Sequence, residues 1–352
     1  MSILRFAVVA AALVAACAVP LAGAFGLPAA RPGGSLTIVA GGDVALVGQG
    51  ATSSTFAGIR RFLHGDIVFA NLEGTLAADG TPKCSPYGVN GCFTFRADPA
   101  SAKELRRAGF TVMNVANNHD MDYGAAAQGE TMSALRSAHI AFDGLPGQIS
   151  VVKAGPLRVA FIGTAPYPWA QSLLDIRATA RLVQRATGLA DVVVVYMHAG
   201  AEGSSADHVP AGPETFLGEQ RGDPRAFAHA MIDAGASLVL ASGPHTLRGM
   251  EWYHGHLIAY SLGNLAGNDT LSTSGSLSLS ALLSVTLTST GTLTAAKIVP
   301  LRLVGPGTPE YDPSGAAISM IRTLSDDDFG RPGLRIASDG TVAVPPLRRS
   351  SR

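Results

Sequence analysis

Residues 111–120 read TVMNVANNHD, and this stretch decides the fold class. Its first half is an apolar run of the length of a buried β-strand, and its second half is a cluster of polar side chains. Four other segments repeat that order, from apolar run to Asp, Glu or His: LTIVAGGD (36–43), DIVFANLE (66–73), DVVVVYMH (191–198) and SLVLASGPH (237–245). Because α/β proteins place their sites at the carboxyl ends of strands, the five segments predict one site at a sheet edge.

The segments between these strands have helical patterns, which makes the chain an alternation of strand and helix. Such alternation predicts a layered α/β fold with strands buried on both faces. A further buried strand is predicted at 158–163, and the predicted helices are 99–108, 125–138, 173–187 and 223–234. After Tyr253 the pattern changes to consecutive strands with little helix. We therefore expect one domain over 36–305, followed by a lightly structured tail over 306–352.

The polar residues at the strand ends share a chemistry that suits a metal ion. Carboxylate oxygen, amide oxygen and neutral imidazole are ligands of borderline divalent ions such as Mn²⁺, Zn²⁺ or Fe²⁺. Each residue alone could belong to a turn or to the rim of a strand, but their joint occurrence predicts a metal centre. The candidate residues are Asp43, Glu73, Asn118, His119, His198 and His245.

The charge balance of the chain argues against a nucleic-acid partner. Its 352 residues include 26 Lys and Arg and 26 Asp and Glu, so no net charge attracts a phosphate backbone. Charged residues make up only 15% of the chain, whereas about 25% is typical of soluble domains. Part of this deficit lies in the first thirty residues, where Arg5 is the one charged side chain.

That N-terminal segment, 1–35, predicts export from the cytoplasm, with three alternatives for its fate. Small residues precede Cys17 after an apolar run, as in a lipoprotein signal whose cysteine is lipidated. The order Ala22-Gly23-Ala24 is also typical of an ordinary cleavage site. Uncleaved, the 22 residues from Phe6 to Leu27 are long enough to cross a membrane. Two of the alternatives tether the protein to the membrane, which is therefore the expected location.

The remaining cysteines, Cys84 and Cys92, lie in the loop-like segment KCSPYGVNGCF (83–93). In the oxidising compartment that export implies, they predict a disulfide closing a short surface loop, with two free thiols as the alternative.

Five blocks of the sequence, in order and spacing, resemble bacterial capsule-synthesis proteins of the CapA or poly-γ-glutamate (PGA_cap) type. The blocks are GGDVALVGQG (41–50), VFANLEGTL (68–76), NVANNHDMDYG (114–124), VVVVYMHAGAE (192–202) and SGPHTLRGMEWYHGHLIAYSLGN (242–264). This family is considered related to calcineurin-like metallophosphoesterases. The resemblance therefore implies a four-layer αββα sandwich with a two-metal centre.

The same resemblance assigns roles to the candidate residues. It implies that Asp43, Glu73 and His245 hold one metal ion, with Glu73 in the place of a bridging aspartate. A second ion would be held by Glu73, Asn118 and His198. His119 would meet the phosphate or the leaving group and is the candidate catalytic residue.

Three positions depart from the phosphoesterase pattern. Ala45 stands where a histidine is expected, Gly243 replaces the first histidine of the last motif, and Ala199 replaces an aromatic residue. Each metal would lose one ligand, so one ion or two, or none, remain open.

Five further residues are candidates for supporting roles. Glu202, Asp120 and Asn264 could support the ligands or line the pocket, and Arg96 and Arg248 could either hold an anionic substrate or form surface salt bridges.

Two functional hypotheses follow. The first is a metal-dependent hydrolase or transferase acting on a phosphoester or amide bond outside the cytoplasm. The second is a non-catalytic subunit of a polymer synthesis or export complex, which binds an anionic polymer or capsule-synthesis proteins on a degenerate phosphoesterase scaffold.

Overall fold

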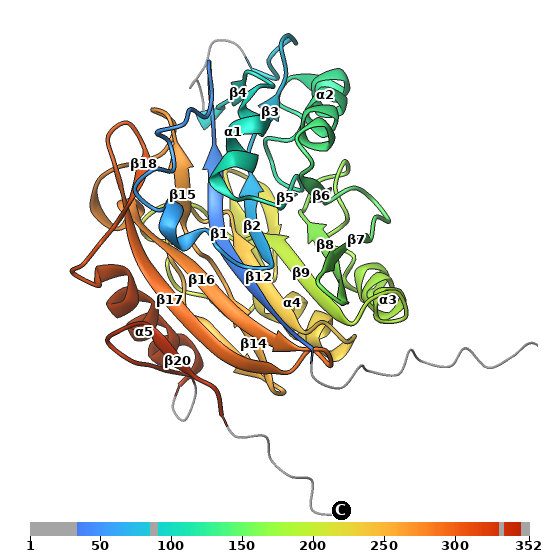
Figure 1. Cartoon of the computed structure of the whole chain (residues 1–352), viewed down its shortest axis with the longest axis vertical. Helices are drawn as coiled ribbons and strands as arrows, with labels where there is room; N and C mark the ends of the chain where they lie inside the picture. The colour runs from blue at the N-terminus through green and yellow to red at the C-terminus, as the bar shows by residue number, and fades with distance from the viewer. Residues whose placement is uncertain (1–33, 85–90, 331–333, 346–352) are drawn as a thin grey trace, which may run out of the picture.

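The computed structural model describes residues 34–84, 91–330 and 334–345, which form two large β-sheets (Figure 1). The larger has ten strands in the order β19-β20-β17-β16-β1-β2-β5-β6, with β15 beside β1 and β18 beside β17. Its strands are β1 (Ser35–Ala45), β2 (Ile67–Leu72), β5 (Val112–Asn114), β6 (Ala141–Asp143), β15 (Asn264–Gly267), β16 (Leu279–Thr288), β17 (Leu293–Val304), β18 (Thr308–Tyr311), β19 (Arg335–Ile336) and β20 (Thr341–Ala343).

The smaller sheet has six strands in the order β13-β14-β12-β9-β8-β7. They are β7 (Ser150–Ala154), β8 (Leu157–Thr164), β9 (Val192–His198), β12 (Leu238–Ser242), β13 (Met250–Tyr253) and β14 (His256–Ala259). Two short ribbons complete the strands: β3 (Thr75–Leu76) with β4 (Arg96–Ala97), and the hairpin β10 (Glu214–Phe216) with β11 (Glu219–Gly222).

Alternating side chains along the strands produce the layers. On β1, Ile38 packs between the two sheets while Val39 packs on the outer face; on β9, Val194 and Val195 divide in the same way. Helices α1 (Ser101–Ala108) and α2 (Gly124–Ser137) cover the larger sheet, and α3 (Ile176–Thr187) and α4 (Pro224–Asp233) cover the smaller one. The order helix, sheet, sheet, helix is the predicted four-layer αββα sandwich.

Phe69 of β2 and Phe161 of β8 stack across the interface of the sheets, with ring centroids 5.5 Å apart. Within each sheet the central strands are parallel: β1, β2, β5 and β6 in the larger, and β8, β9, β12 and β14 in the smaller. Their carboxyl ends therefore lie along one edge of each sheet. The candidate site is formed where these two edges meet.

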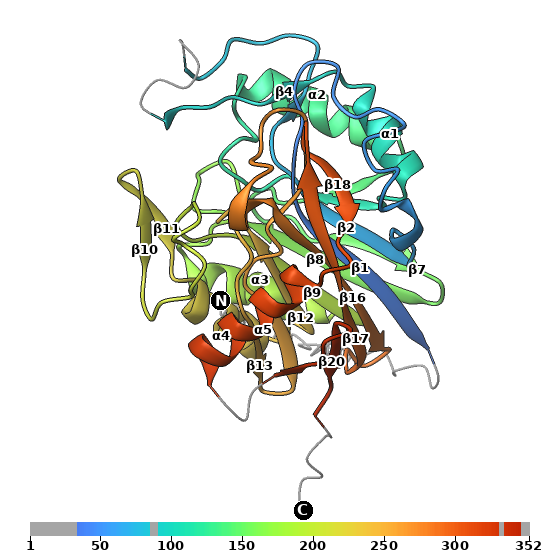
Figure 2. The ribbon, with the colours of Figure 1, turned by 90° about the vertical axis from the view of Figure 1, so that its left-hand side faces the viewer.

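The C-terminal segment is more structured than expected. Instead of a lightly structured tail, residues after 305 form β18, β19, β20 and helix α5 (Ala316–Phe329), which lies beside β17 (Figures 1 and 2). Ala317, Ile318 and Ile321 of α5 are buried in the core between the sheets. Their spacing places them on one helical face, a pattern that the surrounding Gly, Pro and Asp residues obscured. The described residues also form two short 3₁₀ helices, Arg60–Phe62 and Gly275–Ser278.

Within the three described ranges, no helix is long and apolar enough to cross a membrane. The predicted signal or anchor segment and its candidate lipidation residue, Cys17, lie outside them.

Candidate metal centre

Asp43 reaches the site because β1 approaches another strand end very closely. A Cβ atom on Gly42 would lie 1.8 Å from the carbonyl oxygen of Gly263, so a residue with a side chain does not fit there. The backbone N–H of Asp43 donates to that same oxygen over 3.0 Å. The glycine of the GGD motif is thus needed for close packing, and it brings Asp43 beside the loop that follows β12.

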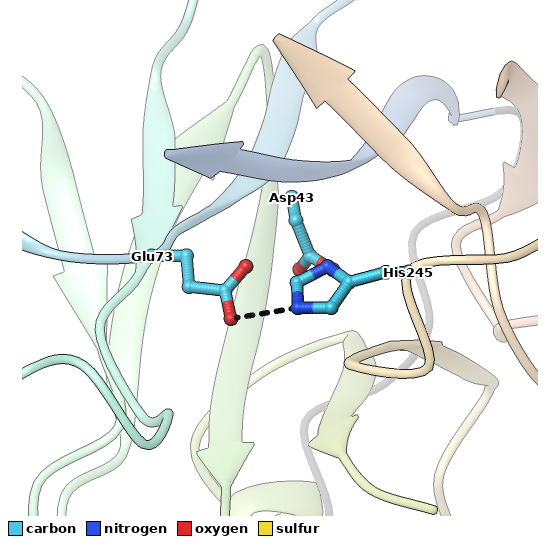
Figure 3. Close-up of side chains that lie close together, drawn as sticks. All are labelled: Asp43, Glu73 and His245. Atoms are coloured by element: carbon cyan, nitrogen blue, oxygen red, sulfur yellow. Dashed lines mark ion pairs between the residues drawn. The ribbon is translucent and has the colours of Figure 1, made fainter. Parts of the chain in front are cut away.

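Asp43, Glu73 and His245 form a cluster (Figure 3). One ligand atom from each lies within 4.8 Å of those of the other two. The Nε2 atom of His245 is 3.6 Å from Glu73 Oε1, and its Nδ1 atom is 3.5 Å from Asp43 Oδ2. These are the three residues that the resemblance assigns to one metal ion, and they come from both sheets.

Glu73 is the centre of the arrangement. It follows β2, is fully buried, and neither carboxylate oxygen has a hydrogen-bond partner among the described residues. Three imidazoles face its Oε1 atom: His245 at 3.6 Å, His198 at 3.7 Å and His119 at 4.0 Å. Burial, together with the charge of Asp43, raises the pKa of Glu73 well above its usual value. A cation beside it would stabilise this buried carboxylate, and the oxygen and imidazole ligands around it fit a divalent metal ion.

Asp43 differs from Glu73 because its oxygens are held by donors. Oδ1 accepts hydrogen bonds from Asn71 Nδ2 at 2.8 Å and from the hydroxyl of Ser242, and Oδ2 accepts from the N–H of Gly243 at 3.2 Å. Burial raises the pKa of Asp43, and the charge of His245 and these hydrogen bonds oppose that rise. The carboxylate is thereby fixed in one orientation.

His245 has an unusual backbone conformation for a residue other than glycine. Its φ is 58°, in the left-handed region, where non-glycine residues are rare and often functional. Its Nδ1 atom lies 2.9 Å from Asn264 Oδ1, and this contact directs Nε2 toward Glu73. Burial lowers the pKa of His245, but the carboxylates of Glu73, Asp43 and Glu202 together outweigh it and raise the pKa to about 9.

His198 and His119 lie on the other side of Glu73. His198 is fully buried, and its Nε2 atom has no hydrogen-bond partner among the residues placed by the structure. Burial lowers its pKa well below the usual value, so the ring is neutral and can act as a ligand. His119 is fixed by Asp122, whose Oδ2 atom lies 2.7 Å from Nδ1, and by stacking on Phe95 at 4.2 Å. Burial also lowers the pKa of His119.

Asn118 is half-buried next to His119, and its side-chain oxygen Oδ1 is another buried acceptor without a partner within the described ranges. Its backbone oxygen accepts from Lys83 Nζ at 2.9 Å. A free amide oxygen is suited to a cation, in agreement with the ligand role implied for Asn118.

The structure explains one departure from the phosphoesterase pattern. Gly243 has φ 115°, and a Cβ atom there would lie 3.3 Å from the ring of His198. A histidine at 243 would therefore be strained and crowded, and the backbone N–H contacts Asp43 instead. Ala45 is a fully buried methyl group and offers no ligand.

Two candidates for holding an anionic substrate lie elsewhere. Arg248 is fully buried, and its guanidinium forms two hydrogen bonds of 2.8 and 2.7 Å with the carboxylate of Glu214. Arg96 donates to the backbone oxygens of Ala77 and Ala78 and lies over the ring of Tyr123. Neither side chain lines the cleft beside the centre, so the structure does not bring these two arginines together with the other candidates.

The other three candidates lie in or near the site. Asn264 holds His245 through the contact with Nδ1. Glu202 Oε2 lies 3.8 Å from His245 Nε2, and Glu202 Oε1 lies 2.7 Å from Arg221 Nη2. Asp120 is buried, accepts a hydrogen bond from Gln128, and burial raises its pKa to about 7. Asp120 is not part of the cluster around Glu73.

Sequence reasoning assigned no role to Asn71, Ser242 or Arg221, which hold the ligands or their neighbours. Asn71 and Ser242 end the same strand segments that carry Glu73 and His245, and this position was the signal available for them. Arg221 lies in a hairpin with no pattern that points to the site.

A cleft of about 390 Å³ opens beside His119, Asn118 and Glu202. The stacked rings of Tyr167 and Trp169 lie along it, together with residues of the β10–β11 hairpin, which projects from the body in Figure 2. The cleft is further lined by Lys83, Gly91, Cys92, Phe93, Phe216, Leu217, Glu219 and Arg221.

The predicted disulfide is present in the same region. It joins Cys84 and Cys92, whose Cα atoms are 6.2 Å apart. Because Cys92 lines the cleft, the disulfide holds one of its walls.

The chain is similar in sequence to capsule biosynthesis proteins. The capsule biosynthesis protein CapA of Bacillus anthracis is 28% identical over 262 residues, which cover 66% of this chain and 60% of that protein. The PGA biosynthesis protein CapA of Bacillus subtilis (strain 168) is 29% identical over 220 residues, 58% of this chain and 53% of that one. The chain thus matches between half and two thirds of the length of these relatives.

Among solved structures, a 5'-nucleotidase precursor from Thermus thermophilus aligns with 83% of this chain and 59% of its own, with a TM-score of 0.41 and 16% identity. The NAD nucleotidase of Haemophilus influenzae aligns with 83% and 56%, with a TM-score of 0.40 and 11% identity.

The family model described as bacterial capsule synthesis protein PGA_cap matches residues 37–269, which include every residue of the candidate centre. The chain belongs to this bacterial capsule-synthesis family.

Proposed function

We propose that this protein is a metal-dependent hydrolase or transferase of capsule biosynthesis, acting on a phosphoester or amide bond. The observation that carries the proposal is Glu73, a fully buried carboxylate without hydrogen-bond partners among the described residues, facing three imidazoles and lying beside Asp43. Mn²⁺, Fe²⁺ or Zn²⁺ suits this mixture of oxygen and nitrogen ligands.

Asp43, Glu73 and His245 would hold the first ion, and Glu73, His198 and Asn118 are the residues available for a second. A bound ion would polarise a phosphoryl or carbonyl oxygen and lower the pKa of a bound water. Asp122 accepts from Nδ1–H of His119, which leaves Nε2 free to take up the proton of an attacking water and would stabilise the charged ring that results. His119 could then return that proton to a leaving group in the cleft.

We propose further that the chain is exported and tethered to the membrane by its N-terminus, and that it works on or with an anionic capsule polymer. The apolar segment from Phe6 and the Cys84–Cys92 disulfide support export. The mass of the mature N-terminus tests this: a lipid on Cys17 or an intact Met1 supports tethering, and cleavage after Ala24 contradicts it.

Metal binding is the first test of the catalytic proposal. Titration of the chelator-treated full chain with Mn²⁺, Fe²⁺ and Zn²⁺ by calorimetry should show binding, and Glu73→Gln should weaken it at least ~100-fold, because removing a mere supporting partner already costs 10–100-fold. Glu310→Gln, an exposed carboxylate on β18, is the matched control and should bind as the unchanged protein does. No measurable binding by the unchanged protein would contradict the proposal.

Turnover is the second test. A panel of p-nitrophenyl phosphate mono- and diesters and of γ-glutamyl anilides should show metal-dependent hydrolysis that His119→Ala reduces. Metal binding without turnover of any substrate would favour the non-catalytic subunit instead, in which the site binds polymer or protein partners. The replacement of two ligand positions by Ala45 and Gly243 is the observation that favours this alternative.

A further inference from the structure

Four polar side chains form a row across the larger sheet, leading away from the candidate centre. β1, β2, β5 and β6 are parallel neighbours, and their ends pair Asp43 with Asn71, Asn71 with Asn114, and Asn114 with Asp143. All four side chains are fully buried. Polar groups in such a place require hydrogen bonds within the protein.

The orientation of both amides in the row follows from its anionic end. A carboxylate only accepts, so Asn71 must present its NH₂ group to Asp43 Oδ1, at 2.8 Å. Asn71 Oδ1 then faces the next strand and accepts from Asn114 Nδ2 at 2.6 Å. The other hydrogen of Asn114 Nδ2 is used by the backbone oxygen of Ala116 at 3.0 Å. Asn114 therefore has both donors engaged, and its Oδ1 atom faces the far end of the row.

That far end lacks a donor. Asn114 Oδ1 and both carboxyl oxygens of Asp143 have no hydrogen-bond partner among the described residues. Both groups lie against Gly163 of β8 in the opposite sheet, where a Cβ atom would be 1.9 Å from Asn114 Oδ1 and 3.2 Å from Asp143 Oδ2. A single proton on Asp143 would satisfy one acceptor on each residue.

We propose that Asp143 is a positioning residue of the metal centre: its protonated carboxyl group donates to Asn114 Oδ1, so that one N–H of each amide in the row points toward Asp43. Asp143 thereby fixes Asn114, which together with Asn117 (Nδ2 3.0 Å from Asn71 Oδ1) fixes Asn71, and Asn71 fixes the carboxylate of Asp43 as a metal ligand. This role rests on the proposed function, because it concerns the affinity of that same site for a divalent ion.

The surroundings of Asp143 support this protonation. Burial raises its pKa to about 8. Tyr196 on β9 is the titratable side chain of the opposite sheet that interacts with Asp143, and burial keeps Tyr196 neutral by raising its pKa. The hydroxyl of Tyr196 is hydrogen-bonded to Ser242, which donates to Asp43 from the other sheet. The row and this second contact therefore hold Asp43 from both sides.

Two substitutions separate positioning from general stability. Asp143→Asn keeps a donor for Asn114 Oδ1, and the full chain should bind Mn²⁺ within about threefold of the unchanged protein. Asp143→Leu has a similar shape without a donor and should weaken Mn²⁺ binding about tenfold, at the lower end of the range for partners behind a ligand. Asp312→Asn, a buried aspartate in the loop before α5, is the matched control and should leave the affinity unchanged. A residue with a purely structural role would change the melting temperature without this difference in affinity.

A second measurement does not depend on metal or on the affinity of any variant. In the metal-free protein at pH 6.5, the ¹³Cγ shift of Asp143, assigned by comparison with Asp143→Asn, should be that of a neutral carboxyl group. An ionised Asp143 would overturn the proposal, as would equal Mn²⁺ affinity in a folded Asp143→Leu. If the unchanged protein binds no divalent ion but Asp143 is neutral, the proposed function fails while the protonated row stands.

Discussion

Gly163→Ala tests the packing of the two sheets against the polar row. The new Cβ atom would lie 1.9 Å from Asn114 Oδ1, whereas real Cβ contacts essentially never fall under 3.0 Å. Asn114 cannot turn aside without cost, because Nδ2 is bonded to Asn71 Oδ1 and to the oxygen of Ala116. Either these two hydrogen bonds break or the sheets separate locally.

The magnitude follows from the first, less disruptive outcome. Each buried polar group left without its hydrogen bond costs about 1–3 kcal/mol, so two such losses cost about 2–6 kcal/mol. The alanine also reduces the freedom of the unfolded chain, which returns about 0.4–1 kcal/mol. We therefore expect the metal-free variant to be destabilised by about 2–5 kcal/mol.

Urea denaturation of the metal-free full chain measures this difference, with disulfides kept intact. Gly129→Ala is the matched control, because Gly129 is exposed on α2 and a Cβ atom there meets nothing within 4 Å. That change should stabilise the protein by about 0.5–1 kcal/mol through helix propensity. A Gly163→Ala variant within about 1 kcal/mol of the unchanged protein, with the same denaturant slope, would refute the packing argument.

Three further predictions concern charge. Mn²⁺ affinity should rise about 90-fold from pH 6 to pH 8, because His245, with a pKa of about 9, must lose its proton to bind the ion. A histidine with an unshifted pKa would give a rise in affinity of about fourfold, and calorimetry at the two pH values decides between the two results. Asp143 should disfavour the folded metal-free protein progressively as pH rises from 4 to 8, since folded Asp143 keeps a proton that the unfolded chain releases. Between those pH values Asp143→Asn should therefore gain about 2–5 kcal/mol of stability relative to the unchanged protein in urea titrations, and parallel pH profiles would contradict the assignment. Arg248→Ala should lower the free energy of unfolding by about 3–5 kcal/mol, because it leaves Glu214 buried without its partner; a loss below 1 kcal/mol would show that the pair is solvated.

The strand ends could be predicted from the sequence because short apolar runs that stop at polar residues have a direct structural meaning. Parallel strands bring such ends to one edge, and Asp43, Glu73 and His245 meet there as expected. The family blocks added the αββα arrangement of layers, which local periodicity cannot give.

Other features depend on contacts that no local pattern records. Arg248 is engaged by Glu214, a residue in a separate hairpin, so its sequence position next to the site was misleading. Asn114 and Asp143 looked like ordinary strand termini, and only the register of β5 and β6 reveals that they continue a row. Helix α5 was missed because its apolar face, with Ala317, Ile318, Ile321 and Leu324, lies in a segment rich in Gly, Pro and Asp.

The placement of the ligands on two sheets has a consequence for unfolding. Asp43 and Glu73 come from the larger sheet, while His198 and His245 come from the smaller one. An ion held between them would cross-link the halves of the sandwich, so neither half could detach without releasing it. Occupancy of the site would then depend on the packing of the two sheets. A substitution that loosens the shared core would therefore lower metal affinity before it unfolds the chain.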